Sequence, residues 1–310
     1  MHNSTVETLT RRRRGNLNKS WDLYLLLIPA LVFLFVFSYG PLYGALIAFK
    51  DYSVVRGVWA SDWVGLKHFE RFVNSPIFFR LVRNTLTLSV YALVAGFPLP
   101  IILALLVNKL RFLRFKKFFQ TASYAPYFIS TVVLVGMLRI FFMAGIGVVN
   151  NIMVSFGGPD IDFFGSSSAF PHLYVLSNIW RSIGWGSIIY VAALSNIDPS
   201  LYEAARCDGA SKFKLLLHID IPCLMPTIII LLILNTGGLM SVGYEQAFLM
   251  QTPLNTETSE IISTYVYKIG LLDAQFSYST AINMFNSIIN FILLISVNRI
   301  ARSVGETSLW

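Results

Sequence analysis

Polar and aromatic side chains stand at helical spacing inside a long apolar stretch of this sequence. In residues 173–197, Asn178, Arg181 and Trp185 are spaced i, i+3, i+7, so one helix face carries all three. An amide, a guanidinium and an aromatic plane suit a sugar, because they hydrogen-bond to hydroxyls and stack against the ring. A structural interpretation stays open, in which Arg181 pairs with an acid such as Glu245 or with a helix end, and the Trp packs against lipid or a neighbouring helix.

A second stripe of polar side chains lies near the C-terminus. Asn283, Asn286 and Asn290 repeat the same spacing within residues 274–298. Three amides in one stripe avoid lipid, so they face either a water-filled path or a neighbouring helix to which they hydrogen-bond. Further candidates for contact with such a path are Asn235, Tyr244, Glu245 and Gln246, of which the Glu also fits a loop in water.

The stretches that carry these residues belong to a chain that is poor in charge. Only 13% of its 310 residues are charged, against about 25% in soluble domains, and its mean hydropathy is +0.63. Such a chain hides apolar surface in lipid, where about 20 apolar residues span the hydrocarbon core and a helix satisfies the backbone. We therefore predict an all-α integral membrane protein with six transmembrane helices, at 23–49, 84–108, 118–138, 173–197, 221–244 and 274–298.

The basic residues predict how the chain lies in the membrane. With the N-terminus in the cytoplasm, most of the 24 Lys and Arg residues fall on the cytoplasmic side, although the first outer loop is also basic. This predicts cytoplasmic tails at 1–20 and 303–310 around a six-helix domain at 21–302. Contact with anionic lipid accounts for the net charge of +8 without a nucleic acid partner. The outer loop at 54–80 forms either a helix in the membrane interface or an ordinary folded loop.

Sequence motifs of enzymes are missing. The chain has no G-x-x-x-x-G-K-[ST] loop, so it does not bind a nucleotide through that motif. H-E-x-x-H and G-x-S-x-G are missing too, and the four His are scattered, so we expect neither catalysis nor a metal site. An ion-coupled secondary transporter would carry acids within its spans, yet none of the six stretches has Asp or Glu in its middle.

A short amphipathic segment, residues 198–222, lies between the fourth and fifth stretches. Asp198 can cap a first helix, or Ser200 can begin a capping box, and Gly209 can end that helix in a left-handed conformation. Ser211 can cap a second helix, and the closing proline predicts a turn into the fifth stretch. The second helix carries an apolar face of Phe213, Leu216 and Leu217. An exposed apolar patch indicates a partner surface, or it only dips into lipid headgroups.

The sequence EAARCDGASKFKLLLHIDIP, residues 203–222, resembles the E-A-A-x-x-x-G-x(9)-I-x-L-P loop of importers of the ATP-binding-cassette (ABC) class. Ile221 replaces the usual Leu of that motif. The resemblance implies a pair of coupling helices, which in that family sit in a cleft of a cytoplasmic ATPase. The residues that match the motif are Glu203, Ala204, Ala205, Gly209 and Pro222, and the predicted coupling residues also include Asp208, Ser211 and Phe213.

Four more segments are similar to permeases of complex-carbohydrate importers, the subgroup of lipoprotein-linked, alginate and pectin-fragment systems. They are 37–53, 63–86, 243–254 and 264–281. The resemblance implies a type I ABC importer fold in a bacterial cell (inner) membrane, and half of an import pathway for an oligosaccharide or sugar derivative. It also implies a second homologous permease, an external solute-binding protein and two ATPase subunits that hold ATP and Mg²⁺, while this chain binds no cofactor. On the loop alone, a permease for amino acids or phosphate stays open.

Overall fold

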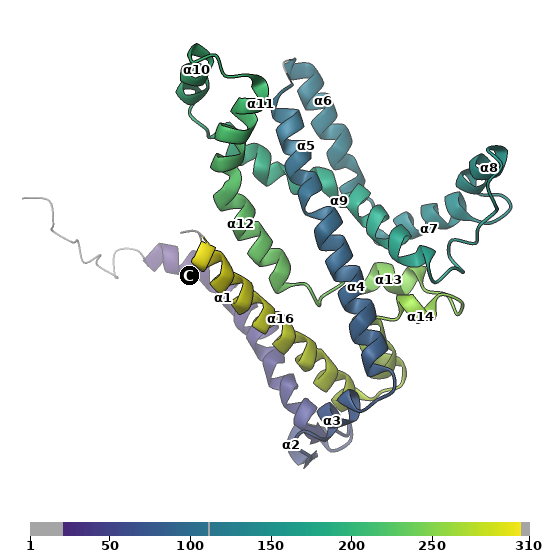
Figure 1. Cartoon of the computed structure of the whole chain (residues 1–310). Helices are drawn as coiled ribbons and strands as arrows, with labels where there is room; N and C mark the ends of the chain where they lie inside the picture. The colour runs from purple at the N-terminus through teal and green to yellow at the C-terminus, as the bar shows by residue number, and fades with distance from the viewer. Residues whose placement is uncertain (1–20, 111, 305–310) are drawn as a thin grey trace, which may run out of the picture.

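The structure is a computed structural model that describes residues 21–110 and 112–304. The predicted tails at 1–20 and 303–310 lie outside this part of the chain, except that the last helix continues through 303 and 304. Helices make up most of the described chain, as predicted (Figure 1). The strands among these residues are an antiparallel pair, β1 (Lys50–Asp51) and β2 (Asp62–Trp63).

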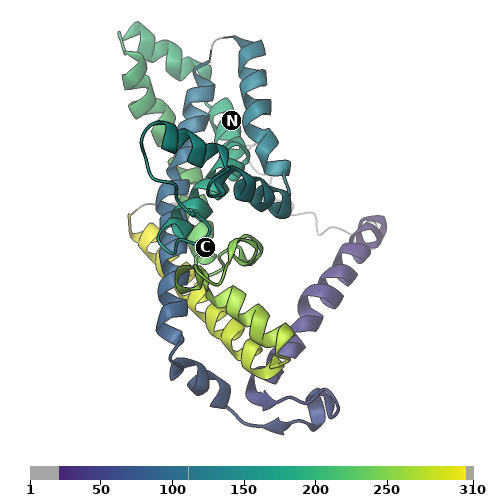
Figure 2. The ribbon, with the colours of Figure 1, turned by 90° about the vertical axis from the view of Figure 1, so that its right-hand side faces the viewer.

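The first part of the chain forms one long rod and then a folded loop. α1 (Trp21–Leu34) continues through η2 (Phe35–Tyr39) and η3 (Gly40–Phe49), and the loop holds α2 (Gly57–Ala60) and α3 (Lys67–Val73) besides the hairpin. α1 stands apart from the other helices in Figure 2, and residues 24–43 are exposed. α3 packs against the C-terminal helix and buries Phe72, which favours a folded loop at 54–80 over a helix lying free in the membrane interface.

Long helices build the rest of the molecule, joined by short ones. α4 (Phe78–Gly96) and α5 (Pro98–Asn108) form a central rod, followed by α6 (Leu113–Tyr124), η4 (Ala125–Phe128), α7 (Thr131–Phe142) and α8 (Val148–Ser155). α9 (Ala169–Ser195) packs along α5, and α10 (Pro199–Cys207), α11 (Lys212–Leu215), η5 (Leu216–Asp220) and α12 (Ile221–Gly237) come next. The chain ends with α13 (Tyr244–Met250), α14 (Thr256–Ser259), α15 (Ile262–Tyr267), η6 (Lys268–Leu272) and α16 (Phe276–Val304).

By length and apolarity, the described residues provide four candidate membrane spans: Tyr24–Phe49, Phe78–Asn108, Lys212–Gly237 and Phe276–Ser303. A fifth arises if Leu113–Phe128 and Thr131–Phe142 cross as one, although they meet at 96°. The stretch predicted at 118–138 is therefore not one straight helix, because Ser130 is extended and caps α7 by accepting a hydrogen bond from the amide of Val133. α9 has 27 residues but is less apolar than the four, so the count of six spans stays a prediction.

Three apolar clusters hold the helices together. One joins α4, α7, α9 and α13, and a second joins α3, α4, α15 and α16. The third joins α5, α9 and α12 through Ala104, Tyr190, Leu194 and Leu224, all buried. Close packing of this kind holds α5, α9 and α12 against one another, and these three helices surround the candidate site together with α4.

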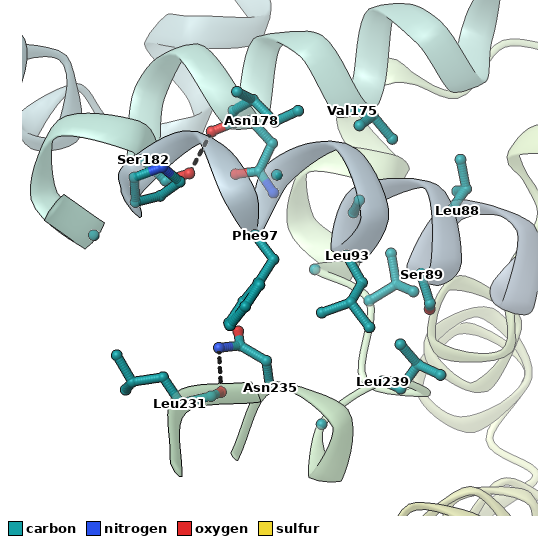
Figure 3. Close-up of a pocket in the computed structure, with 18 of the residues that line it drawn as sticks. Leu88, Ser89, Leu93, Phe97, Val175, Asn178, Ser182, Leu231, Asn235 and Leu239 are labelled. Carbon is teal, nitrogen blue, oxygen red and sulfur yellow. Dashed lines mark hydrogen bonds between the residues drawn. The ribbon is translucent and has the colours of Figure 1, made fainter. Parts of the chain in front are cut away.

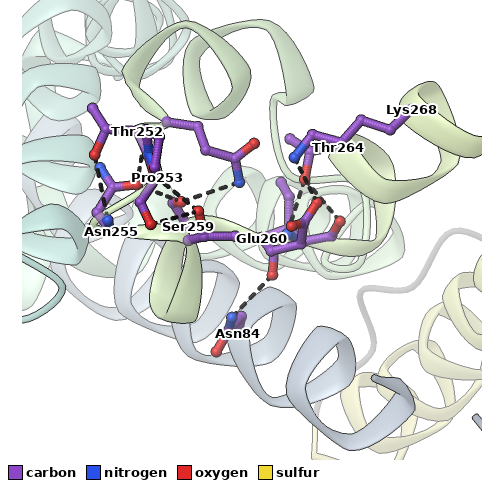
Figure 4. A network of polar contacts seen from close by, with 11 residues as sticks. Asn84, Thr252, Pro253, Asn255, Ser259, Glu260, Thr264 and Lys268 are labelled. Atoms are coloured by element: carbon purple, nitrogen blue, oxygen red, sulfur yellow. Dashed lines mark hydrogen bonds and ion pairs between the residues drawn. The ribbon is translucent and has the colours of Figure 1, made fainter. Parts of the chain in front are cut away.

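A polar network fixes the segment after α13 onto α4 (Figure 4). The buried Asn84 donates from Nδ2 to the carbonyl oxygens of Glu257, at 2.7 Å, and Glu260, at 2.9 Å. The buried carboxylate of Glu260 in turn pairs with Lys268 Nζ at 2.9 Å. Because each of these buried polar groups has a partner, the network holds residues 257–260 in a fixed position on α4, which is far from them in sequence.

Replacing Asn84 with Leu is expected to lower the free energy of unfolding by about 1–3 kcal/mol, because two carbonyl oxygens lose their donor. The measurement is the thermal unfolding midpoint of the purified chain in detergent. Asn283→Leu is the matched control, because the amide of Asn283 is exposed on α16. Equal midpoints for both variants would contradict the role assigned to Asn84.

Candidate functional site

A cavity of about 420 Å³ lies where α4, α5, α9 and α12 meet (Figure 3). Apolar side chains make up most of its wall, and amide, hydroxyl and aromatic groups interrupt them. Phe97 extends from the junction of α4 and α5 toward Asn235 of α12. No Asp, Glu, Lys, Arg or His from the described residues lines this cavity, so it presents hydrogen-bonding groups without a formal charge.

Two of the three residues predicted on one face of α9 line this cavity. Asn178 and Trp185 are in its wall together with Ser182, which the sequence analysis missed although it shares their helix face. Arg181 is not in the wall: its Nη1 donates to Thr131 Oγ1 at 2.9 Å, at the start of α7. The structure thus supports the interpretation that Arg181 binds a helix end, and within the described chain it forms no ion pair with Glu245.

Trp185 belongs to an aromatic stack at the edge of the cavity. Its ring lies parallel to that of Tyr127, with centroids 4.6 Å apart and planes at 4°, and Phe128 meets it edge-on at 5.9 Å. The Trp side chain is still 43% exposed. A ring that is held on one side by Tyr127 and remains partly exposed is a preorganised surface for stacking.

The fifth predicted stretch, 221–244, is not helical throughout, because α12 ends at Gly237 and residues 238–243 form a non-helical break. Asn290 Oδ1 accepts from the Met240 amide at 2.8 Å, and its Nδ2 donates to Ser241 Oγ at 2.9 Å. Asn286 Nδ2 donates to the Met240 carbonyl at 3.2 Å. Irregular backbone in a membrane protein needs such partners, so two of the three stripe amides bind a neighbouring segment.

The other path candidates lie in different surroundings. Asn283 is exposed, and Asn235 lines the cavity while its Nδ2 donates to the Leu231 carbonyl at 2.7 Å. Tyr244 and Glu245 are exposed at the start of α13. Gln246 is buried, and its Nε2 donates to Ser177 Oγ at 2.9 Å and to the Tyr174 carbonyl at 3.2 Å. Its contacts therefore hold α13 against α9.

The first predicted coupling helix, α10, begins and ends as its sequence predicts. Asp198 caps it by accepting the Ser200 amide at 2.9 Å, and this hydrogen bond lowers the pKa of the Asp198 carboxyl. Gly209 has φ of +75°. Its amide donates to the Arg206 carbonyl at 3.0 Å and that of Ala210 to the Ala205 carbonyl at 2.9 Å, the two bonds of a Schellman cap.

The second predicted coupling helix, which begins with α11, differs from the prediction at its end. Ser211 caps α11 by accepting the Lys214 amide at 3.3 Å, and Phe213 is 67% exposed, as the predicted apolar face requires. The turn predicted at Pro222 is wrong, because α11 runs through η5 into α12 as one helix. Pro222 lies in the first turn of α12, where a missing amide hydrogen costs little. Leu215 of α11, which the sequence analysis did not single out, is buried.

Comparison with known proteins identifies the family. Residues 96–306 match the family described as "Binding-protein-dependent transport system inner membrane component". The chain belongs to this family of ABC importer permeases, which are membrane transport components and not enzymes, with ATP hydrolysed in separate subunits.

Similar proteins cover nearly the whole chain. "Protein LplB" of Bacillus subtilis (strain 168) is 43% identical over 93% of this chain and 91% of its own length. The "Polygalacturonan/rhamnogalacturonan transport system permease protein YteP" of the same strain is 43% identical over 93% and 90%. A chain in the crystal structure of a bacterial alginate ABC transporter, in complex with its alginate pentasaccharide-bound periplasmic protein, is 36% identical with a TM-score of 0.86, over 94% of this chain and 98% of that one.

Proposed function

We propose that this permease forms half of the pathway of an ATP-driven importer for an oligosaccharide or sugar derivative. The observation that carries the proposal is the doubly capped α10–α11 segment with the E-A-A-x-x-x-G pattern, in a chain 43% identical to a permease named for polygalacturonan and rhamnogalacturonan transport. The uncharged cavity lined by amides, hydroxyls and Trp185 suits sugar hydroxyls and a sugar ring.

The proposed topology has six membrane spans with both termini in the cytoplasm. The tails would be 1–20 and 303–310, and the permease domain 21–302. α9 would be the fourth span despite its polar residues, because it packs between α5 and α12 and so keeps them from lipid. The segment 198–222 would then lie in the cytoplasm, at the end of the molecule that carries α10 and α11 (Figure 1).

The proposed partners are a second homologous permease, two ATPase subunits that bind ATP and Mg²⁺, and an external solute-binding protein. The ATPases would grip the segment around Glu203, Ala204, Ala205, Asp208 and Gly209, with Phe213 of the second helix beside it. Closure of the ATPases on ATP would move this segment and switch the cavity from inward-facing to outward-facing. ATP can switch the cavity only if it stabilises one of these two states more than the other. The contact between the ATPases and α10 would couple ATP binding to that change of state.

The substrate path is proposed to include Asn178, Trp185 and Asn235, the predicted residues that line the cavity. The other predicted path residues do not line the cavity, so any role of theirs in transport would be indirect. Arg181 would act through Thr131. The rest would act through the helix ends that they border or hold: Tyr244, Glu245, Gln246, Asn283, Asn286 and Asn290. The uncharged wall from this chain indicates that any carboxylates of the sugar would be met by another subunit.

Trp185→Ala is expected to lower sugar import about fivefold, because a stacked aromatic contact contributes about 1 kcal/mol. The measurement is uptake of labelled neutral and uronic-acid oligosaccharides by cells that express the complete importer. Trp180→Ala is the matched control, since Trp180 is on the same helix, 48% exposed, and outside this cavity. Equal uptake by Trp185→Ala and the wild type would show that the Trp185 ring does not contact the substrate.

Purification of the tagged chain from native membranes tests the proposed function directly. We expect two copies of an ATPase and one sister permease to co-purify with it, and uptake to depend on ATP. Uptake that is driven by an ion gradient without an ATPase would overturn the proposal. If the complex imports amino acids or phosphate and no sugars, the protein would still be part of an ATP-driven importer, but the proposed substrate class would be refuted.

A further inference from the structure

The first coupling helix, α10, has little contact with the body of the protein. None of its residues is buried. A cavity of about 720 Å³, lined by Lys109, Leu110, Glu203 and Arg206 among others, separates it from the end of α5. Within the described chain, Tyr202 is the one α10 side chain that hydrogen-bonds to another element: its hydroxyl donates to Asp220 Oδ1 at 2.6 Å. Apolar packing of α10 against the body is therefore slight, and this hydrogen bond is its direct side-chain link to another element.

Asp220, the acceptor of that bond, connects α10 to a third element. It is the last residue of η5 and is fully buried. Its Oδ2 pairs with Lys109 Nζ, directly after the last residue of α5, and the same Nζ lies 5.5 Å from the centre of the Tyr202 ring. A buried carboxylate needs a cation and donors around it, so the three side chains hold one another in place.

The protonation of Tyr202 suits its position as the donor in this contact. Burial first, and then the hydrogen bond and charge of Asp220, raise the pKa of the Tyr202 hydroxyl above its ordinary range. The phenol therefore keeps its proton at physiological pH and remains a hydrogen-bond donor to the carboxylate. A hydrogen bond to a charged acceptor is stronger than one between neutral groups.

Two rigid helices lead from these three residues to the central cavity. α5 ends at Asn108, beside Lys109, and Phe97 and Pro100 at its other end line that cavity. Its 11 residues span about 16 Å. α12 begins directly after Asp220, and its Asn235 lines the same cavity. A displacement at the three residues therefore reaches two walls of the proposed substrate path.

We propose that Tyr202, Asp220 and Lys109 form a joint that passes movement of α10 to α5 and α12. The joint rests on the proposed function, in which an ATPase grips α10. These three are positioning residues, because none of them lines the central cavity. The π-helical turn η5, which ends at Asp220, is the kind of distortion that recurs at functional sites.

The test follows opening of the cavity and needs no knowledge of the sugar. The substitution Ser182→Cys, in the cavity wall, is introduced together with Cys207→Ser and Cys223→Ser, and the complete complex is purified with its ATPases. The readout is the rate at which a maleimide probe modifies this cysteine, with and without trapping by ATP and vanadate. In the parent complex we expect trapping to change that rate, because the cavity then opens to the other side of the membrane and the probe reaches the cysteine differently.

Tyr202→Phe and Lys109→Met are expected to reduce this trapping-dependent change at least about fivefold, because each removes a bond to the buried charge. The ATPases should remain bound in the same amount. Tyr202→Phe removes a single hydroxyl, so it keeps the test valid if Lys109→Met, which leaves Asp220 unpaired, fails to fold. The matched controls are Tyr43→Phe, in η3 at the opposite end of the molecule, and Lys117→Met, an exposed lysine on α6.

The outcomes separate the joint from the function on which it rests. If no ATPase co-purifies with the parent chain, the proposed function itself fails. If ATPases bind and both variants keep the parent's trapping-dependent change, the joint alone is refuted. Loss of ATPase binding in Tyr202→Phe would also refute it, because the residue would then build the docking surface and not transmit its movement.

Discussion

Replacing Gly209 with proline is expected to abolish ATP-driven import while the protein still reaches the membrane. Gly209 has φ of +75°, and its amide donates to the Arg206 carbonyl. Proline fixes φ near −65° and has no amide hydrogen, so it loses both the conformation and the bond. A cost of about 3 kcal/mol depopulates the native loop about a hundredfold. The measurement combines immunoblotting of membranes, ATPase co-purification and oligosaccharide uptake.

The matched control at this position is Gly209→Asn. Asn tolerates the left-handed region and keeps the amide hydrogen, and a Cβ at Gly209 meets nothing within 4 Å, so the two variants differ in the loop conformation and in the hydrogen bond to the Arg206 carbonyl. We expect Asn to keep most of the import that Pro loses. Glu203→Lys, an exposed charge reversal on α10, should weaken ATPase binding without disturbing the loop. Normal uptake by Gly209→Pro and Glu203→Lys together would rule out a coupling role for this segment.

The second large effect is expected at Gly184, in the middle of α9. A Cβ there would lie 1.9 Å from the carbonyl oxygen of Ser123 and 2.4 Å from its carbon, at the end of α6. Both are backbone atoms of a helix, so neither can rotate away as a side chain does. Gly184→Ala must push α9 from α6, at a cost of about 3 kcal/mol or more.

We expect Gly184→Ala to reduce the amount of folded permease in the membrane several-fold and to lower its unfolding midpoint in detergent. Gly136→Ala is the matched control, because it makes the same change in α7 where a Cβ meets nothing within 4 Å. The unfolding midpoint of Gly136→Ala should equal that of the wild type or exceed it slightly, because Ala stabilises a helix more than Gly does. If the two alanine variants were equally stable, α9 and α6 would not pack as closely as the structure has them.

The helix caps of the segment 198–222 were predictable from the sequence, because their determinants are local. Asp198, Gly209 and Ser211 act on backbone groups within three or four residues of themselves, and each does what its type and position indicate. The turn at Pro222 was the exception. A proline in the first turn of a helix looks the same in sequence whether a helix starts there or an earlier one continues through a π-helical turn.

The candidate cavity was predictable only in part. Helical spacing correctly grouped Asn178 with Trp185, but it also included Arg181, which turns to Thr131 instead. Likewise, spacing could not tell whether the Asn286 and Asn290 amides face a path or a neighbour. The break at 238–243 that they bind is apolar enough to read as a continuing span.

By itself, the amino-acid sequence determined that this is a helical membrane protein with a capped loop, and its motif spacing indicated the family. Hydropathy, capping residues and motif spacing are properties of short segments, so they need no knowledge of the rest of the chain. Only the tertiary structure decided which amides line the cavity and that Lys109 meets Asp220. These contacts depend on how far each helix is rotated about its axis, and that rotation is set by packing among side chains distant in sequence.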